Sequence, residues 1–380
     1  MKTENVKGFK DYIGEEAKKR ADVKKLIIFL FERYGFSPVE TPIVEYEEFV
    51  KGPEAQSNDE AVSDIFKLQD KGKRKLALRY EFTFQLKRLI QNQKLPFKRY
   101  QIGKVFRDEP VSMNRFREFT QCDIDVIGSS IKDEAEILAL TKDVLENIGI
   151  KPIILINNRK LLNEILEDEG VKEKDKQQVM RELDKYGKLS EKEIKKNLKK
   201  YKAENLINLF KKGEKYFSQF NSYKEIISLK EYCKAYGVEV LFSPTIIRGL
   251  SYYNGSVFEI KAKGIRETIV GGGSYMINGI QSSGISFGLD RLASLATIKE
   301  KEQTYLVVSL EQDRQAIKIA RKLRIKGNIV KMFYGKPSKA LAYANSYDID
   351  NVIFIGEKEV KKKSFKVKDM KTGKEKKLVF

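Results

Sequence analysis

The sequence predicts an α+β protein: a domain built on an antiparallel sheet, a helical insertion, and a small α/β domain at the carboxyl end. Three observations support this. A charged strand–loop–strand segment spans 104–125, Lys- and Glu-rich helical periodicity fills 168–238, and strand and helix patterns alternate over 303–380. The 380 residues suffice for two or three domains.

The first elements follow from hydrophobic spacing. Residues 14–34 carry an apolar stripe that predicts a helix, and Gly35 ends it. Residues 36–50 are expected to be extended, since Pro38 and Pro42 interrupt them. Residues 73–91 run from a strand into a helix, and after the hairpin a helix over 132–150 precedes a buried strand over 151–158. The stripe of the first helix consists of Val23, Leu26, Ile27, Leu30 and Phe31.

The later elements define the expected domains. In the insertion, Ser190 and Glu193 form a capping box that starts a helix. Strand signals return over 238–262, and a glycine cluster over 270–296 ends in a helix. The tail is expected to be βαβαβ with a terminal hairpin over 366–380. The predicted domains are a core from 1–167 and 239–300, an insertion over 168–238, and an α/β domain over 303–380.

Composition excludes several kinds of site. The chain has no histidine, and Cys122 and Cys233 form no CxxC pair, so a Ser-His-Asp triad, a histidine base and a Cys- or His-ligated metal such as zinc are excluded. No apolar stretch has the length of a membrane span, and the polar start lacks a signal-peptide core, which predicts a soluble cytoplasmic protein without membrane contact.

The charge balance predicts a polyanionic partner. Lys and Arg number 74 against 54 Asp and Glu, giving +20, and nucleic acid is the usual partner of such a chain. About half of this excess lies in 303–380, which has 19 Lys and Arg against 8 Asp and Glu. A lysine-rich genome would give the same balance without function, and charge alone leaves both explanations open.

The hairpin over 104–125 places charges on one face. Successive side chains on a strand point to opposite faces. One face therefore holds Arg107 and Glu109 on the first strand, while the alternate residues Thr120, Cys122 and Ile124 face the other way. A solvent-exposed face is the ordinary explanation for such charges, and the floor of an active site is the other. The alternation of side chains alone does not decide between the two. The charged face of the second strand consists of Arg115, Arg117, Phe119, Gln121, Asp123 and Asp125.

The segments of the chain resemble, in order, those of the histidyl-tRNA synthetases, a family of class II aminoacyl-tRNA synthetases. The hairpin "KVFRDEPVSMNRFREFTQCDID" resembles motif 2, "GFSPVETPIVE" resembles the motif 1 dimer segment around Pro42, and "GISFGLDRL" resembles motif 3. The segment "RGLSYYNGSVFEI" is similar to one specific to this family, as is "LALRYEFT". The resemblance covers nearly the whole chain and implies the class II fold, with the hairpin as the floor of the active site.

The resemblance implies a histidine–tRNA ligase, which joins histidine to ATP and then to tRNA(His). It implies that Arg107 holds the ATP α-phosphate and the histidine carboxylate, with Mg²⁺ assisting, and that Arg248 is a family-specific cation at the same place. Glu109 would meet adenine and Phe119 would stack on it, while Arg115 and Arg291 would hold the γ-phosphate. Arg291 is expected just inside a helix after a glycine-rich turn. A homodimer is also implied.

The resemblance also implies how L-histidine is held. Glu81, Thr83 and Gln121 would accept from the α-ammonium group, with Phe82 in the same segment. Asp125 and Tyr253 would read the imidazole nitrogens, with Tyr252 beside them. Taken alone, the tyrosine pair could equally be packing aromatics.

Some residues depart from the family pattern, and other functions are considered. Ser251 replaces an Asp, Ser274 and Met276 replace the Arg and Asp of an Arg-Tyr-Asp run, and the "PVSMN" loop lacks the common Gln-Lys pattern. The alternative is a histidine-binding paralogue that does not ligate, such as an ATP phosphoribosyltransferase regulatory subunit. The phosphate-binding arginines and the tail oppose it. Synthetases for threonine, proline or glycine are opposed by "RGLSYY".

Overall fold

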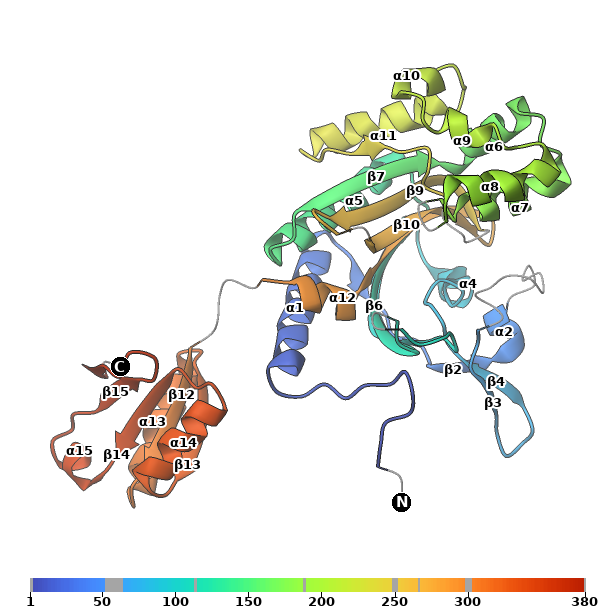
Figure 1. Ribbon diagram of the computed structural model, residues 1–380. Helices are drawn as coiled ribbons and strands as arrows, with labels where there is room; N and C mark the ends of the chain where they lie inside the picture. The colour runs from blue at the N-terminus through green and yellow to red at the C-terminus, as the bar shows by residue number, and fades with distance from the viewer. Residues whose placement is uncertain are drawn as a thin grey trace. The chain divides into compact units, whose positions relative to one another are not determined.

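The computed structural model describes residues 3–51, 64–112, 115–186, 189–247, 252–265, 267–297 and 303–378. The chain divides into two compact units, Met1–Thr297 and Ile298–Phe380, and each is described by itself (Figure 1). Within the described residues, no helix combines the length and the apolar character needed to cross a membrane.

The first unit is built on an eight-stranded sheet of order β1-β5-β6-β11-β10-β9-β7-β8. The pairs β1/β5 and β7/β8 are parallel and the other neighbours are antiparallel, which agrees with the expected fold class. The hairpin predicted from motif 2 is β5 and β6, which are the second and third strands in this order. The strands are β1 (Ser37–Pro38), β5 (Phe97–Phe106), β6 (Glu118–Ile127), β7 (Pro152–Asn158), β8 (Leu241–Phe242), β9 (Tyr253–Ala262), β10 (Thr268–Ile277) and β11 (Ile280–Gly288).

Helices α1 (Gly14–Arg33), α5 (Ile131–Asn147) and α12 (Leu289–Leu295) cover one face of this sheet. The apolar stripe of α1 is buried as expected except for the half-buried Leu26, and its Phe31 packs on Phe287 of β11. Ser130 and Asp133 form a capping box that fixes the start of α5, a contribution of about 1 kcal/mol. With one face closed by helices, the polar side chains of β6 lie on the other face.

A small sheet and a helical segment complete the unit. The sheet has the order β2-β4-β3, from β2 (Val44–Tyr46), β3 (Lys67–Gln69) and β4 (Lys75–Leu78). Residues 168–238 are helical, the Ser190–Glu193 capping box is confirmed, and α11 packs on α5 and β7 (Figure 1). The remaining helices are α2 (Glu47–Lys51), α4 (Leu86–Leu89), η1 (Ile90–Asn92), α6 (Arg159–Asp168), α7 (Glu173–Leu183), α8 (Glu191–Leu198), η2 (Lys199–Tyr201), α9 (Leu206–Leu209), α10 (Glu214–Phe217) and α11 (Tyr223–Ala235).

Two local predictions are wrong. Residues Glu47–Lys51 form α2 rather than an extended segment, because Glu47 and Glu48 suit a helix N-terminus and Val50 is buried beneath them. The glycines before Arg291 lie mainly within β10 and β11 rather than in a turn, and at Gly272, Gly273 and Gly284 atoms of the neighbouring strands leave no room for a Cβ atom.

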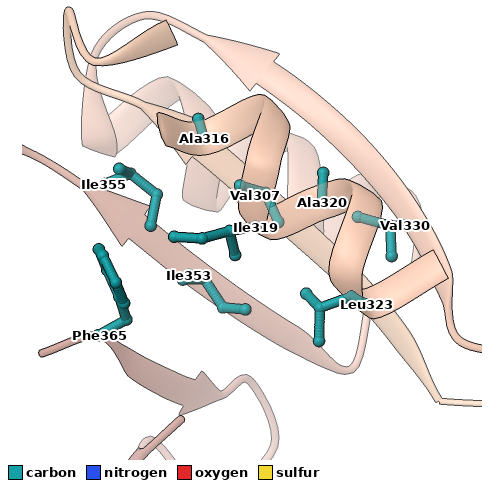
Figure 2. Close-up of a cluster of buried hydrophobic side chains, with 9 residues drawn as sticks. All are labelled: Val307, Ala316, Ile319, Ala320, Leu323, Val330, Ile353, Ile355 and Phe365. Atoms are coloured by element: carbon teal, nitrogen blue, oxygen red, sulfur yellow. The ribbon is translucent and has the colours of Figure 1, made fainter. Parts of the chain in front are cut away.

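The second unit is a five-stranded sheet of order β13-β12-β14-β15-β16, as the βαβαβ pattern and terminal hairpin predict. Helix α13 covers one face, where Ile319 and Leu323 meet Val307 and Ile353 (Figure 2). Helix α14 covers the other face, over Leu306, Val308 and Val352. The elements are β12 (Thr304–Ser309), α13 (Asp313–Ile325), β13 (Ile329–Tyr334), α14 (Pro337–Ser346), β14 (Asn351–Ile355), α15 (Glu357–Lys361), β15 (Lys366–Asp369) and β16 (Glu375–Lys377).

Candidate active site

A cavity of about 360 Å³ lies on the sheet face that the helices leave open. Strands β6, β10 and β11 form its floor, and the segments after β4 and β5 contribute to its wall. Both kinds of charge line it, which identifies it as the candidate site. The expected site residues among its lining are Glu81, Thr83, Arg107, Glu109, Arg115, Phe119, Gln121, Asp125, Tyr252, Tyr253 and Arg291.

The alternation along β6 determines which of its side chains reach the cavity. Phe119, Gln121, Asp123 and Asp125 line it, while Cys122, in the opposite parity, is buried on the helix-covered face. The three polar residues are buried as well, so a solvated hairpin face is ruled out. The parity prediction is therefore confirmed for β6.

Glycines in the neighbouring strand make room for these side chains. Gly284 of β11 pairs with Asp125, and a Cβ atom at Gly284 would lie 2.1 Å from Asp125 Oδ1. A Cβ atom at Gly273 of β10 would lie 2.8 Å from the Tyr253 ring. Neither glycine has a positive φ, so these residues are required by close side-chain approach rather than by backbone conformation.

Asp125 is part of a buried charged network. The Arg99 guanidinium, which is 0% exposed, places Nη2 2.6 Å from Asp125 Oδ2, and the Tyr275 hydroxyl donates to Oδ1. Burial raises the pKa of Asp125, and Arg99 opposes that rise. The Nε and Nη1 atoms of Arg99 have no hydrogen-bond partner among the described residues. The pair thus keeps a carboxylate in a buried position at the cost of partly unsatisfied donors.

Asp123 adds a second carboxylate on the same strand face. Its Oδ1 accepts from the Ser286 hydroxyl at 2.5 Å and from Gln121 Nε2 at 3.1 Å. Burial raises the pKa of Asp123 to about 6, and Arg99 opposes the rise. Gln121 thereby has its amide nitrogen held toward Asp123, and its Oε1 lacks a partner among the described residues. That oxygen is buried and unpaired within the described part of the chain, in a residue that lines the cavity floor.

Glu81 is a third buried carboxylate. Burial raises its pKa to about 7, the nearby Arg107 lowers it, and the charges of Asp123 and Asp125 raise it further. Arg107 Nε donates to the Tyr80 carbonyl at 3.3 Å, and its guanidinium lies 5.1 Å from the Phe119 ring centroid. Arg107 therefore lies close to both the buried Glu81 carboxylate and the Phe119 ring.

Phe82 does not line the cavity. Its side chain is fully buried, with the Arg79 guanidinium 4.7 Å from the ring centroid, and its carbonyl accepts from Arg99 Nη2. The structure thus places Phe82 behind the site, next to the arginine that holds Asp125.

The tyrosine pair both packs and lines the cavity. The rings of Tyr252 and Tyr253 are 4.8 Å apart, and the Tyr252 ring is 5.6 Å from that of Tyr275. Burial raises the pKa of Tyr252 well above its usual value, so its hydroxyl stays protonated and can donate. Tyr252 and Tyr253 are therefore both packing aromatics and part of the cavity lining.

The phosphate-binding candidates have partners of their own. Arg115 Nε lies 2.7 Å from Glu109 Oε2, and Arg291 donates to the Thr268 carbonyl. Arg115 is largely exposed, so its guanidinium can turn from Glu109 to an anion at small cost. Arg248 and Ser251 lie outside the described residues.

Asp290 lies next to Arg291 at the start of α12, and its hydrogen bonds connect this helix to the rest of the site. Its Oδ1 accepts from the Tyr12 hydroxyl at 2.7 Å and from Arg20, and its Oδ2 accepts from the Thr120 backbone N–H at 2.8 Å. These contacts fix the start of α12 against β6, which positions Arg291 relative to Phe119.

Ser274 lies on the opposite face of the sheet from the cavity. Its hydroxyl donates to the buried Glu134 of α5, which also accepts from Ser283 at 3.2 Å. Met276, the other departure in this run, is exposed. The departures at 274 and 276 therefore leave the lining of the cavity unchanged.

Sequence reasoning missed several residues of the site. Parity along β6 places Asp123 on the floor, but nothing singled out its role. Arg99, Tyr275, Ser286 and Asp290 reach the site through strand register and helix packing, which the sequence does not display.

Comparison with known families gives one consistent result. Residues 8–292 match the family model described as Histidyl-tRNA synthetase, and residues 295–380 match that of an Anticodon binding domain. The chain is 34% identical over 414 residues to Histidine--tRNA ligase 1 of Bacillus cereus ATCC 14579, covering 99% of this chain and 97% of the relative. It is 34% identical over 426 residues to Histidine--tRNA ligase of Clostridium acetobutylicum, covering 98% and 96%.

Two solved structures are also similar. The histidyl-tRNA synthetase from Nostoc sp. PCC 7120 has a TM-score of 0.87 and 26% identity, covering 100% of this chain and 97% of that one. A Bacillus halodurans protein described as ATP phosphoribosyltransferase regulatory subunit/histidyl-tRNA synthetase has a TM-score of 0.76 and 24% identity, covering 93% and 98%. At that identity the second likeness supports the fold alone.

Proposed function

The chain belongs to the histidyl-tRNA synthetase family, and from this premise we propose that it is a histidine–tRNA ligase acting on L-histidine, ATP and tRNA(His). One observation carries the proposal: a single cavity holds three buried carboxylates beside Arg107, Arg115 and Arg291. Carboxylates suit an amino acid's ammonium group and its imidazole N–H, and arginines suit phosphates.

In the first step, a histidine carboxylate oxygen attacks the ATP α-phosphorus. The new O–P bond forms as the bond from the α-phosphorus to the bridging oxygen breaks, and pyrophosphate leaves. Negative charge increases on the phosphoryl oxygens, so fixed cations lower the barrier without proton transfer. Arg107, between Glu81 and Phe119, is where the carboxylate and the α-phosphate would meet.

In the second step, a terminal ribose hydroxyl of the tRNA attacks the carbonyl carbon of histidyl-adenylate. The new ester forms as the bond to the adenylate oxygen breaks, AMP leaves, and the hydroxyl proton is released. The arginines that held the α-phosphate now stabilise the AMP leaving group.

Histidine recognition would use the buried end of the cavity. Glu81, Thr83 and Gln121, which all line the cavity, would accept from the α-ammonium group. Asp125 would accept one imidazole N–H, and its fixed bonds from Arg99 and Tyr275 orient it for that task. Because Arg99 balances Asp125, the site favours the neutral imidazole over imidazolium.

ATP recognition would use the open end. Adenine would stack on Phe119, and because the Arg107 guanidinium lies 5.1 Å from the centroid of that ring, the α-phosphate would be within its reach. Mg²⁺ would bind together with ATP, whose phosphate oxygens would supply most of its ligands. Glu109 is a carboxylate in the cavity lining that could provide a further ligand to the ion. The cation would neutralise phosphate charge during attack.

The non-ligating alternative is not favoured. The Bacillus halodurans protein described as ATP phosphoribosyltransferase regulatory subunit/histidyl-tRNA synthetase covers 93% of this chain. Chain length therefore does not separate a regulatory subunit from a ligase. The arginines do, because a protein that only binds histidine has no use for Arg115 and Arg291 beside the carboxylates.

ATP–pyrophosphate exchange with each of the common amino acids, followed by charging of tRNA(His), tests the proposal. Exchange with histidine alone, and charging of tRNA(His) alone, are expected. Exchange with another amino acid or none would refute the assignment, and exchange without charging would establish a non-ligating paralogue. Arg107→Ala should abolish exchange, and Arg314→Ala in α13 is the matched control.

We also propose a homodimer covering the outer face of the small sheet. Val44, Tyr46 and Leu68 are 42%, 52% and 42% exposed on this face, and register places Leu76 and Leu78 beside them. Such an apolar face adjacent to Pro42 suits a second copy. Tyr46→Lys should give monomers by sedimentation velocity, whereas Tyr236→Lys, at a site of 49% exposure, should not. A dimeric Tyr46→Lys variant would contradict this.

A further inference from the structure

The second unit carries two tyrosines at the end of α14: Tyr343 in its last turn and Tyr347 at its C-cap. Tyr343 and Tyr347 are four residues apart and share a helix face, with ring centroids 4.4 Å apart and an interplanar angle of 38°. Tyr343 packs at the edge of the core beneath α14, whereas Tyr347 is 59% exposed. An exposed ring held against another ring is a flat surface preordered for a ligand.

A lysine lies over these rings, and others are found at the start of α14. Lys331 of β13 places Nζ 4.5 Å from the Tyr347 centroid and 5.9 Å from that of Tyr343. Helix α14 contains no Asp or Glu, and Lys336 and Lys339 at its start are exposed. One carboxylate, that of Asp348, follows Tyr347. We call Lys331, Tyr343 and Tyr347 the tyrosine–lysine platform.

We propose that the tyrosine–lysine platform stacks an unpaired base of the tRNA anticodon loop. This rests on the proposed function and names the residues by which the second unit would hold its RNA. A base offers a π-face to Tyr347, and its phosphates offer charge to the lysines. A protein partner fits less well, because it would need a broad apolar area, and the exposed neighbours of Tyr347 on α14 are small or polar.

The rival location is the carboxyl end of the strands, where ligands of open α/β sheets commonly bind. Tyr334, at the end of β13, is 57% exposed there. Within the described part of this unit, neither a second ring nor a cation lies over Tyr334. The platform is preordered and Tyr334 is not, which favours the platform.

The test is binding of the full chain to an RNA stem–loop with the tRNA(His) anticodon, at fixed salt. Tyr347→Ala should weaken binding about five- to 150-fold, the range for one stacked base. Tyr347→Phe should bind within about threefold of the parent because it keeps the ring. Ile325→Ala on α13, at 74% exposure, is the control and should bind as the parent does. Histidine-dependent pyrophosphate exchange, measured without RNA, should be the same in all four proteins.

Other outcomes overturn the proposal. Parental binding by Tyr347→Ala, or no stem–loop binding by the parent, would refute the platform. A loss confined to Tyr334→Ala would place the loop at the strand ends. If exchange is absent from the parent while stem–loop binding depends on Tyr347, the proposed ligase fails and the platform stands.

Discussion

Gly284 lies directly opposite Asp125 in the sheet, so Gly284→Ala tests whether the buried carboxylate is positioned for histidine. The added Cβ atom would lie 2.1 Å from Asp125 Oδ1 and 2.9 Å from the Ile124 carbonyl oxygen, whereas real Cβ atoms essentially never come within 3.0 Å. The backbone carbonyl cannot turn aside, so the Asp125 carboxylate and the strand must both shift. The Arg99 ion pair and the Tyr275 hydrogen bond hold that carboxylate where it is.

The effect on function and the effect on stability should be of similar size in free energy. Overpacking of this kind costs about 1–3 kcal/mol of stability. Displacing a positioned group by about 1 Å can cost on the order of 100-fold in rate. We expect kcat/KM for histidine to fall about 100-fold in pyrophosphate exchange, with KM for ATP within about twofold of the parent because the arginines lie elsewhere in the cavity.

The assay is exchange at varied histidine and at varied ATP, with thermal denaturation to confirm folding. Gly213→Ala is the matched control, because a Cβ atom there has no neighbour within 4 Å and Gly213 has no positive φ. A folded Gly284→Ala protein with the parental kcat/KM for histidine would refute the assigned role of Asp125. An equal rise in both KM values would show instead that the whole cavity had deformed.

Three further predictions follow from the site and the tail. Arg248→Ala should lower histidine-dependent exchange about 100-fold or more without changing the fold, because a charge-assisted contact to the reacting groups is lost; near-parental exchange would contradict this. Because burial raises the pKa of Glu81 to about 7 and its ionised form is the one that binds an ammonium group, kcat/KM for histidine should fall as pH drops through about 7. Glu81→Gln should be less active and lack that step, keeping only the titration of the substrate imidazole; an unchanged profile would exclude Glu81. Deleting 303–380 should spare exchange but reduce the salt dependence of tRNA binding, since fewer phosphates are neutralised, and an unchanged slope in filter binding would show that the tail charge plays no part.

Much of the fold follows from the sequence because its signals are local. The stripe of α1, the capping boxes of α5 and α8, and the βαβαβ tail depend on residues within one or two turns or strands of each other. Helix α2 was not predicted, because five residues carry too weak a periodic signal to outweigh a neighbouring proline.

Alternation along β6 likewise determined which of its side chains lie together. The period of two along a strand is fixed by backbone geometry, so Phe119, Gln121, Asp123 and Asp125 could be assigned to one face from the sequence alone. Which face meets a cavity is decided by what covers the other one, and that depends on α1, α5 and α12 packing from distant parts of the chain.

The tertiary structure alone decided the partners of these residues. Arg99 meets Asp125 because β5 and β6 pair in one register, Tyr275 meets it across β11, and Gly284 leaves the space in which they meet. Asp290 and Tyr12 are 278 positions apart and join through helix packing. Sequence supplied the chemistry of each side chain and its face, whereas register and close approach, which depend on several strands at once, determined which charges are paired and which remain for a substrate.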